Sequence, residues 1–219
     1  MKKTTVLLGA VLLLALTAAA QETPKAEAFL GFTYTRFNSA TNVPAFSANG
    51  GGGQFVFNFN HWLGFVSDIG AVHNGNIGGY HLDSTFTNFM FGPRVPIRIS
   101  SRVTPYVQAL WGGVYASTSA LVQVPPGSVT VPPPVDPGYG VPAGGSARNA
   151  IDLRASTQQT AFAMAYGGGL DIKVNKWMSF RPIGLDYYMT RLQNLRSAND
   201  NNQHNLRYTT GVNFTFGAR

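Results

Sequence analysis

The last stretch of the chain, residues 205–217, alternates strictly between two kinds of side chain. One set is apolar or aromatic except for Thr210 (Leu206, Tyr208, Thr210, Val212, Phe214 and Phe216), and the intervening set is polar or small (Arg207, Thr209, Gly211, Asn213 and Thr215). Successive side chains of a β-strand point to opposite faces, so this pattern predicts a strand with one apolar face. The stretch is long enough to cross a bilayer as a tilted strand of roughly 9–11 residues, and aromatics gather at its end. It therefore predicts a membrane-spanning strand.

Seven earlier segments resemble this strand in length and alternation. The predicted strands are 27–38, 51–60, 63–73, 80–94, 103–116, 158–174, 178–191 and 205–217. Connections after the second, fourth and sixth are short and the others are longer, as with the periplasmic turns and extracellular loops of bacterial barrels. The sequence thus predicts an all-β fold: an eight-stranded antiparallel up-and-down transmembrane β-barrel with both termini in the periplasm. Pro182 predicts a bulge or a strand start, because proline cannot donate to the ladder.

The N-terminus carries the features of a secretory signal. Lys2 and Lys3 form a charged region, residues 6–16 an apolar core, and residues 18–20 a small-residue cleavage site. The core is too short for a membrane helix. We therefore expect a signal peptide at 1–20 and a barrel domain at 21–219. The chain has no cysteine, so neither a lipid-modified cysteine nor a disulfide framework is expected.

Composition supports a membrane barrel. Charged residues make up only 11% of the chain and glycines number 25, whereas charged residues make up about a quarter of an average soluble domain. An outer wall in lipid excludes charge, and a narrow interior favours small residues. The formal net charge is +7, and removal of Lys2 and Lys3 with the signal would leave +5. Because the basic residues are scattered, no nucleic-acid partner is expected.

The predicted connection at 117–157 differs from the others in its proline content. It contains Pro125, Pro126, Pro132, Pro133, Pro134, Pro137 and Pro142, with Gly and Ser between them. Such a composition does not form a strand ladder and is typical of extended surface segments. We expect a Pro/Gly-rich extracellular loop over about 117–157.

The final residues resemble the C-terminal insertion signal of bacterial outer-membrane barrels. The matching positions are Thr209, Gly211, Phe214 and Phe216, although Gly217-Ala218-Arg219 follow where such barrels often end on the aromatic residue. Together with Phe91-Gly92-Pro93-Arg94 and Asp186-Tyr187-Tyr188, this strand resembles the small eight-stranded outer-membrane barrels of the OmpA/OmpX type, the outer membrane protein beta-barrel domain. The resemblance implies a monomer in the outer membrane of a Gram-negative cell. Outer-membrane lipids, lipopolysaccharide and the barrel assembly machinery are then the implied partners.

Strand parity places five charged side chains inside the predicted barrel. They are Asp68, Arg94, Asp171, Asp186 and Arg207, with Glu27 and Lys173 nearer the strand ends. An eight-stranded barrel is just wide enough to be filled by side chains, and buried charges need partners. We interpret the set as a structural ion-pair network that plugs the lumen; a gated conduit is the alternative.

No arrangement of catalytic or metal-binding residues stands out in the sequence. His73 and His81 flank one predicted connection and could in principle share a metal, but loop polarity explains them equally well. The His-x-Ser pair of barrel enzymes that act on lipid A is absent, and His81 and Ser84 fall on opposite strand faces. We expect no enzyme activity and no cofactor. The hypotheses are a structural or surface-interaction protein, a narrow porin-like channel for small solutes, and a lipid A-modifying enzyme, in that order.

The insertion signal yields a first prediction. Because Phe216 is expected to face lipid, Phe216→Asp should block folding into the outer membrane, whereas deletion of Arg219 should have little effect. Heat-modifiable migration of the membrane fraction on SDS gels measures folding. Normal migration of the Phe216→Asp protein would contradict the assignment.

Overall fold

The computed structural model describes residues 23–38, 45–77, 82–98, 100–124, 151–192 and 202–217, and the predicted signal peptide at 1–20 lies outside them. The described chain forms eight strands: β1 (Ala26–Phe37), β2 (Phe46–Asn58), β3 (Gly64–Asn74), β4 (Leu82–Pro96), β5 (Val103–Val124), β6 (Ile151–Lys173), β7 (Met178–Thr190) and β8 (Gln203–Phe216).

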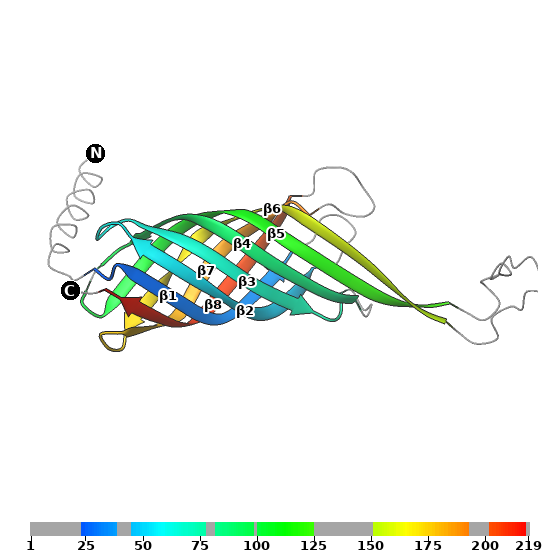
Figure 1. Ribbon diagram of the computed structural model, residues 1–219, viewed down its shortest axis with the longest axis horizontal. Coiled ribbons are helices and arrows are strands. Elements are labelled where there is room, and N and C mark those ends of the chain that lie inside the picture. The colour runs from blue at the N-terminus through cyan, green and yellow to red at the C-terminus, as the bar shows by residue number, and fades with distance from the viewer. Residues whose placement is uncertain are drawn as a thin grey trace, which may run out of the picture.

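The strands form one closed wall in which each pairs antiparallel with its neighbours in sequence, and β1 pairs with β8 (Figure 1). Closure runs along almost all of β1, from Ala26 opposite Phe216 to Arg36 opposite Leu206. The start of β1, the end of β8 and the connections 59–63, 97–102 and 174–177 therefore share one end, here called the short-turn end. The predicted eight-stranded up-and-down barrel is confirmed.

The outer wall is covered with exposed apolar side chains, many of them aromatic. They include Leu30, Phe32, Phe55, Phe57, Phe65, Ile69, Phe89, Phe91, Val107, Phe162, Ile183, Leu185, Leu206, Phe214 and Phe216. A water-soluble monomer rarely exposes such a continuous apolar surface, because its burial from water is strongly favourable. Trp62 and Trp177 are exposed in short turns, where indole rings suit a membrane interface. This wall fits a lipid environment.

In the described part of the chain, no helix has both the length and the apolarity needed to cross a membrane.

The end of the lumen opposite the short turns is filled by aromatic rings. Phe37 lies between Phe46 and Phe86, with ring centroids 4.9 Å and 4.6 Å away, and meets Tyr188 edge-on at 6.5 Å. Aliphatic residues including Ala48, Val56, Val66, Val72, Met90, Leu110, Val114 and Leu192 complete this core. We refer to the four rings as the aromatic layer. It closes the lumen on that side.

The β5–β6 hairpin is longer than predicted and extends past the rest of the barrel (Figure 1). Its two strands pair out to Val124 opposite Ile151, whereas pairing with β4 ends at Ala120 and pairing with β7 begins at Ala163. The predicted strand ends at 116 and 158 are therefore wrong, because β5 and β6 both extend further into the predicted loop. The flanks of that loop are rich in Ser, Thr, Val and Ile, which suit strands, while every proline of the segment lies between the two strands, at 125–150, outside the described residues.

One irregularity interrupts the ladder, and it lies in β7. Register shifts occur between Arg181 and Gly184 against β8 and between Leu170 and Ile172 against β6. The bulge surrounds Pro182, as the missing amide of proline predicts. Since side-chain direction has a period of two, one extra residue reverses which face the preceding residues of β7 occupy.

Close packing at the β1–β8 seam yields a second prediction. A Cβ atom on Gly31 would collide with the backbone of Thr210, whereas one on Gly51 would meet only the Gly31 carbonyl oxygen at 3.5 Å. Gly31→Ala should therefore destabilise the barrel by about 1–3 kcal/mol, with Gly51→Ala as the nearly neutral control. Urea unfolding from lipid vesicles measures both. Equal stability of the two variants would contradict the packing argument.

Candidate functional site in the barrel lumen

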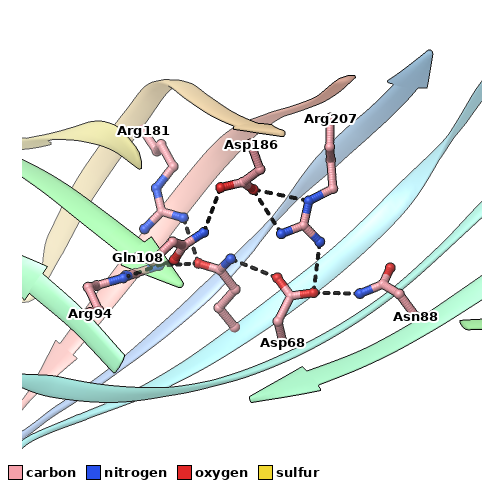
Figure 2. A network of polar contacts seen from close by, with 8 residues as sticks. Asp68, Asn88, Arg94, Gln108, Arg181, Asp186 and Arg207 are labelled. Carbon is pink, nitrogen blue, oxygen red and sulfur yellow. Dashed lines mark hydrogen bonds and ion pairs between the residues drawn. The ribbon is translucent and has the colours of Figure 1, made fainter. Parts of the chain in front are cut away.

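Arg207 joins opposite walls of the barrel through two carboxylates (Figure 2). Its Nη2 and Nε donate to Asp186 Oδ2 on the neighbouring strand β7, at 2.8 Å and 3.1 Å. Its Nη1 donates to Asp68 Oδ1 on β3, at 2.9 Å. All three side chains are almost fully buried. Guanidinium groups suit this role because their donors diverge in one plane and stay charged.

Two glutamines extend this contact across the lumen. Gln54 donates to Asp68 Oδ2 at 2.7 Å, and its Oε1 accepts from Arg181 Nη1 at 2.8 Å and from Arg94 Nη2. Gln108 donates to Asp186 Oδ1 at 3.0 Å, and its Oε1 accepts from Arg94 Nη2 at 2.7 Å. Each amide therefore donates to a carboxylate and accepts from an arginine, which matches its dipole to both charges.

Arg94 has no carboxylate partner among the described residues. Its hydrogen bonds go to the carbonyl oxygens of Gln54 and Gln108, and its guanidinium lies 4.0 Å from the centroid of the Tyr106 ring. Its Nη1 has no partner within the described chain. Arg94 is thus held by amide dipoles and a ring face, an arrangement weaker than an ion pair.

Arg181 makes a third buried ion pair, toward the short-turn end. It donates from Nε to Asp171 Oδ1 at 2.7 Å and from Nη2 to Asp171 Oδ2 at 3.1 Å. Its guanidinium also lies 4.1 Å from the Phe29 ring and 4.5 Å from the Tyr106 ring. The two-point contact fixes the geometry of the pair.

The structure places all five sequence-predicted lumen residues inside the barrel. It brings Asp68, Asp186 and Arg207 into one direct cluster, connects Arg94 to them through amides, and gives Asp171 a different partner, Arg181. Sequence reasoning missed Arg181. Strict alternation along β7, counted back from the inward-facing Asp186, assigns Arg181 to the lipid face. The bulge at Pro182 reverses that assignment, and the proline is the sequence feature that could have indicated the bulge.

The residues of the C-terminal insertion motif occupy both faces of β8. Thr209 is buried inside the barrel, whereas Phe214 and Phe216 are exposed on the outer wall. Gly211 lies opposite Gly31 at the β1–β8 seam. The motif thus combines outward aromatics with a position where the two strands approach closely.

The histidine candidates do not assemble into a site in the described chain. His73 contacts the carboxylate of Asp83 at 3.4 Å and Thr85 Oγ1 at 3.3 Å, both at exposed positions. His81 lies outside the described residues, and Ser84 is buried with its hydroxyl donating to Thr118. Among the residues that the structure describes, no group of three or more His, Cys, Asp or Glu side chains could hold a metal ion.

An apolar outer wall around a charged, hydrogen-bonded interior defines a membrane β-barrel of the bacterial outer-membrane class. The model of the outer membrane protein beta-barrel domain family matches residues 6–219, and the chain belongs to this family. The protein is therefore an outer-membrane barrel protein, as the resemblance in the sequence implied.

Solved structures of small outer-membrane barrels resemble the chain in fold. Neisserial surface protein A matches with a TM-score of 0.58 and 14% identity, over 88% of this chain and 97% of that chain. Ail, the attachment invasion locus protein of Yersinia pestis, matches with a TM-score of 0.51 and 13% identity, over 88% and 99%. At these identities the likeness concerns the fold alone. No curated protein matches the sequence.

The different partners of the lumen arginines yield a third prediction. Arg207→Met leaves Asp68 and Asp186 without their cation and should cost about 3–5 kcal/mol of unfolding free energy. Arg94→Met removes the arginine donor of Gln108 Oε1 and the cation over the Tyr106 ring, while Gln54 Oε1 keeps its bond from Arg181, so it should cost about 1–3 kcal/mol.

Urea unfolding in lipid vesicles compares the two variants, and Asp68→Asn in the Arg207→Met background should restore part of the loss. Equal destabilisation by both single variants, with no coupling between Arg207 and Asp68, would argue against the ion pair as the main contact across the lumen.

Proposed function

We propose that this protein is a non-catalytic outer-membrane barrel that recognises partners at the cell surface through its β5–β6 hairpin. The hairpin carries the proposal, because it is the part of the described chain that extends well past the wall (Figure 1). Barrels of this class have short periplasmic turns and longer extracellular loops. By that rule the short-turn end faces the periplasm and the hairpin faces outward.

The backbone of β6 offers a means of recognition. Residues 151–158 pair with β5 on one side, and the pairing of β6 with β7 begins only at Ala163, with Arg191 donating its amide to the Phe162 carbonyl. Ser156, Thr157 and Gln158 along this edge are exposed and polar. A free strand edge can add an extended segment of another protein by backbone hydrogen bonding.

The lumen supports a structural or recognition role over conduction. The Arg207 cluster spans the lumen, and the aromatic layer lies between it and the hairpin end. An ion would have to displace both a neutralised charge network and packed rings. A narrow channel for small solutes is the alternative, and conductance separates the two.

The remaining partners follow from the outer wall. We propose that the apolar band contacts outer-membrane lipids and lipopolysaccharide as a monomer. We further propose that the barrel assembly machinery recognises the last strand through Thr209, Gly211, Phe214 and Phe216, of which the two phenylalanines are exposed on the wall.

A shortened hairpin tests the recognition role. Ala120 and Ala155 lie opposite each other in the ladder, so residues 121–154 can be replaced by an Asn-Gly turn that keeps the register. Cells displaying the wild type should bind at least one surface in a panel of matrix proteins, polysaccharides and envelope components. Cells displaying the shortened protein should lose that binding while heat-modifiable migration remains normal.

Two outcomes would overturn the proposal. One is identical binding by both proteins. The other is a large steady conductance of the wild type in planar bilayers, which would favour the channel. If the shortened variant fails to migrate as folded protein, an exposed edge residue of the intact hairpin is substituted instead. Gln158→Pro is suitable, because Gln158 has the parity of Phe162, whose carbonyl faces away from β5, so the proline blocks added ladder bonds and keeps the β5–β6 pairing.

A further inference from the structure

A polar cavity of about 280 Å³ opens at the short-turn end of the lumen. Its walls come from the start of β1, the ends of β6 and β8, the start of β7, and the turns before β5 and β7. The charged side chains that line it are Glu27, Arg98, Asp171, Lys173 and Lys176, and the amides are Asn175 and Asn213. This end lies away from both the hairpin and the aromatic layer.

The cations of this cavity outnumber its available anions. Asp171 has both carboxylate oxygens engaged by Arg181, and Glu27 accepts from the amides of Asn58 and Asn213. Arg98, Lys173 and Lys176 make no ion pair within the described residues. Burial lowers the pKa of Arg98 from its ordinary value, and the charge of Glu27 offsets this only in part. The cavity therefore presents positive charge to an entering molecule.

Asn213 lines the same cavity and carries a buried acceptor. The side chain is 1% exposed, its Nδ2 donates to Glu27 Oε2 at 2.7 Å, and its Oδ1 has no partner among the described residues. The amide orientation follows from Glu27, because a flipped amide would set two oxygens against each other. A buried acceptor without a donor is costly, so a ligand that donates here gains more than at the surface.

The inner side of the cavity is closed. The Arg181–Asp171 pair lies at its base, and beyond it come the Gln54 and Gln108 contacts and the Arg207 cluster. A molecule that enters from the short turns meets a neutralised network that it would have to break in order to pass. The cavity is thus shaped as a binding cup.

We propose that this cup binds a small organic anion that carries a hydrogen-bond donor beside its carboxylate or phosphate. The anionic group would lie among Lys173, Lys176 and Arg98, and a neighbouring hydroxyl or ammonium would donate to Asn213 Oδ1. The volume corresponds to about nine water molecules, which suits a ligand the size of an amino acid or a small phosphate ester. This site is independent of the hairpin and of the surface-recognition role.

The test uses the full mature protein in lipid nanodiscs, titrated by calorimetry and by NMR of the backbone amides. Serine and glycerol 3-phosphate represent the carboxylate and phosphate classes, and acetate and ethanolamine carry only the anionic or only the donor half. Saturable binding of serine or glycerol 3-phosphate is expected, about tenfold or more tighter than either half-ligand, with shifts at Lys173, Lys176 and Asn213. The probe that binds tighter identifies the class.

Charge substitutions separate the cup from general surface charge. Lys173→Gln with Lys176→Gln should weaken binding about tenfold or more. Lys25→Gln is the matched control, because Lys25 lies near the same end and is exposed but does not line the cavity. Absence of saturable binding for both probes would overturn the proposal, as would an equal loss in the Lys25→Gln protein.

Discussion

Within a bilayer no water can satisfy the amide and carbonyl groups of a strand edge, so the sheet has to close on itself. Here closure is the pairing of β1 with β8, from Ala26 opposite Phe216 to Arg36 opposite Leu206. Gly31 and Gly211 face each other in this seam, and a Cβ on Gly31 would collide with the neighbouring backbone. Once the seam is formed, every strand has two neighbours, and the direction of each side chain, outward to lipid or inward to the lumen, is set by the pleat.

Closure turns inward-facing charges into buried ones, and this accounts for the composition of the lumen. Arg94, Arg181 and Arg207 are offset by Asp68, Asp171 and Asp186, and all are largely removed from solvent. Direct ion pairs serve two of the arginines, while Gln54 and Gln108 connect the third to the carboxylates through their amide dipoles. A half-paired network in this environment would be strongly destabilising, so its members act as one unit.

The two ends of the barrel differ in chemistry. The aromatic layer around Phe37 closes the lumen below the projecting hairpin. The short-turn end opens into a polar cup lined by three cations that make no ion pair among the described residues. We propose backbone recognition at the part of β6 that extends beyond its pairing with β7, and binding of a small charged molecule in the cup. The buried charge network of the lumen separates these two ends.

The sequence by itself determined the barrel, its strand number and the inward direction of Asp68, Asp186 and Arg207, because alternation with a period of two is a local property of each strand. Only the tertiary structure decided the partners of those charges. Arg207 reaches Asp68 across the lumen because of the stagger of β8 against β3, and Arg94 meets amides because Gln54 and Gln108 lie beside it. It also decided that Arg181 faces inward, since the bulge at Pro182 reverses the parity of β7, and the position of a bulge depends on the neighbouring strands that pair around it.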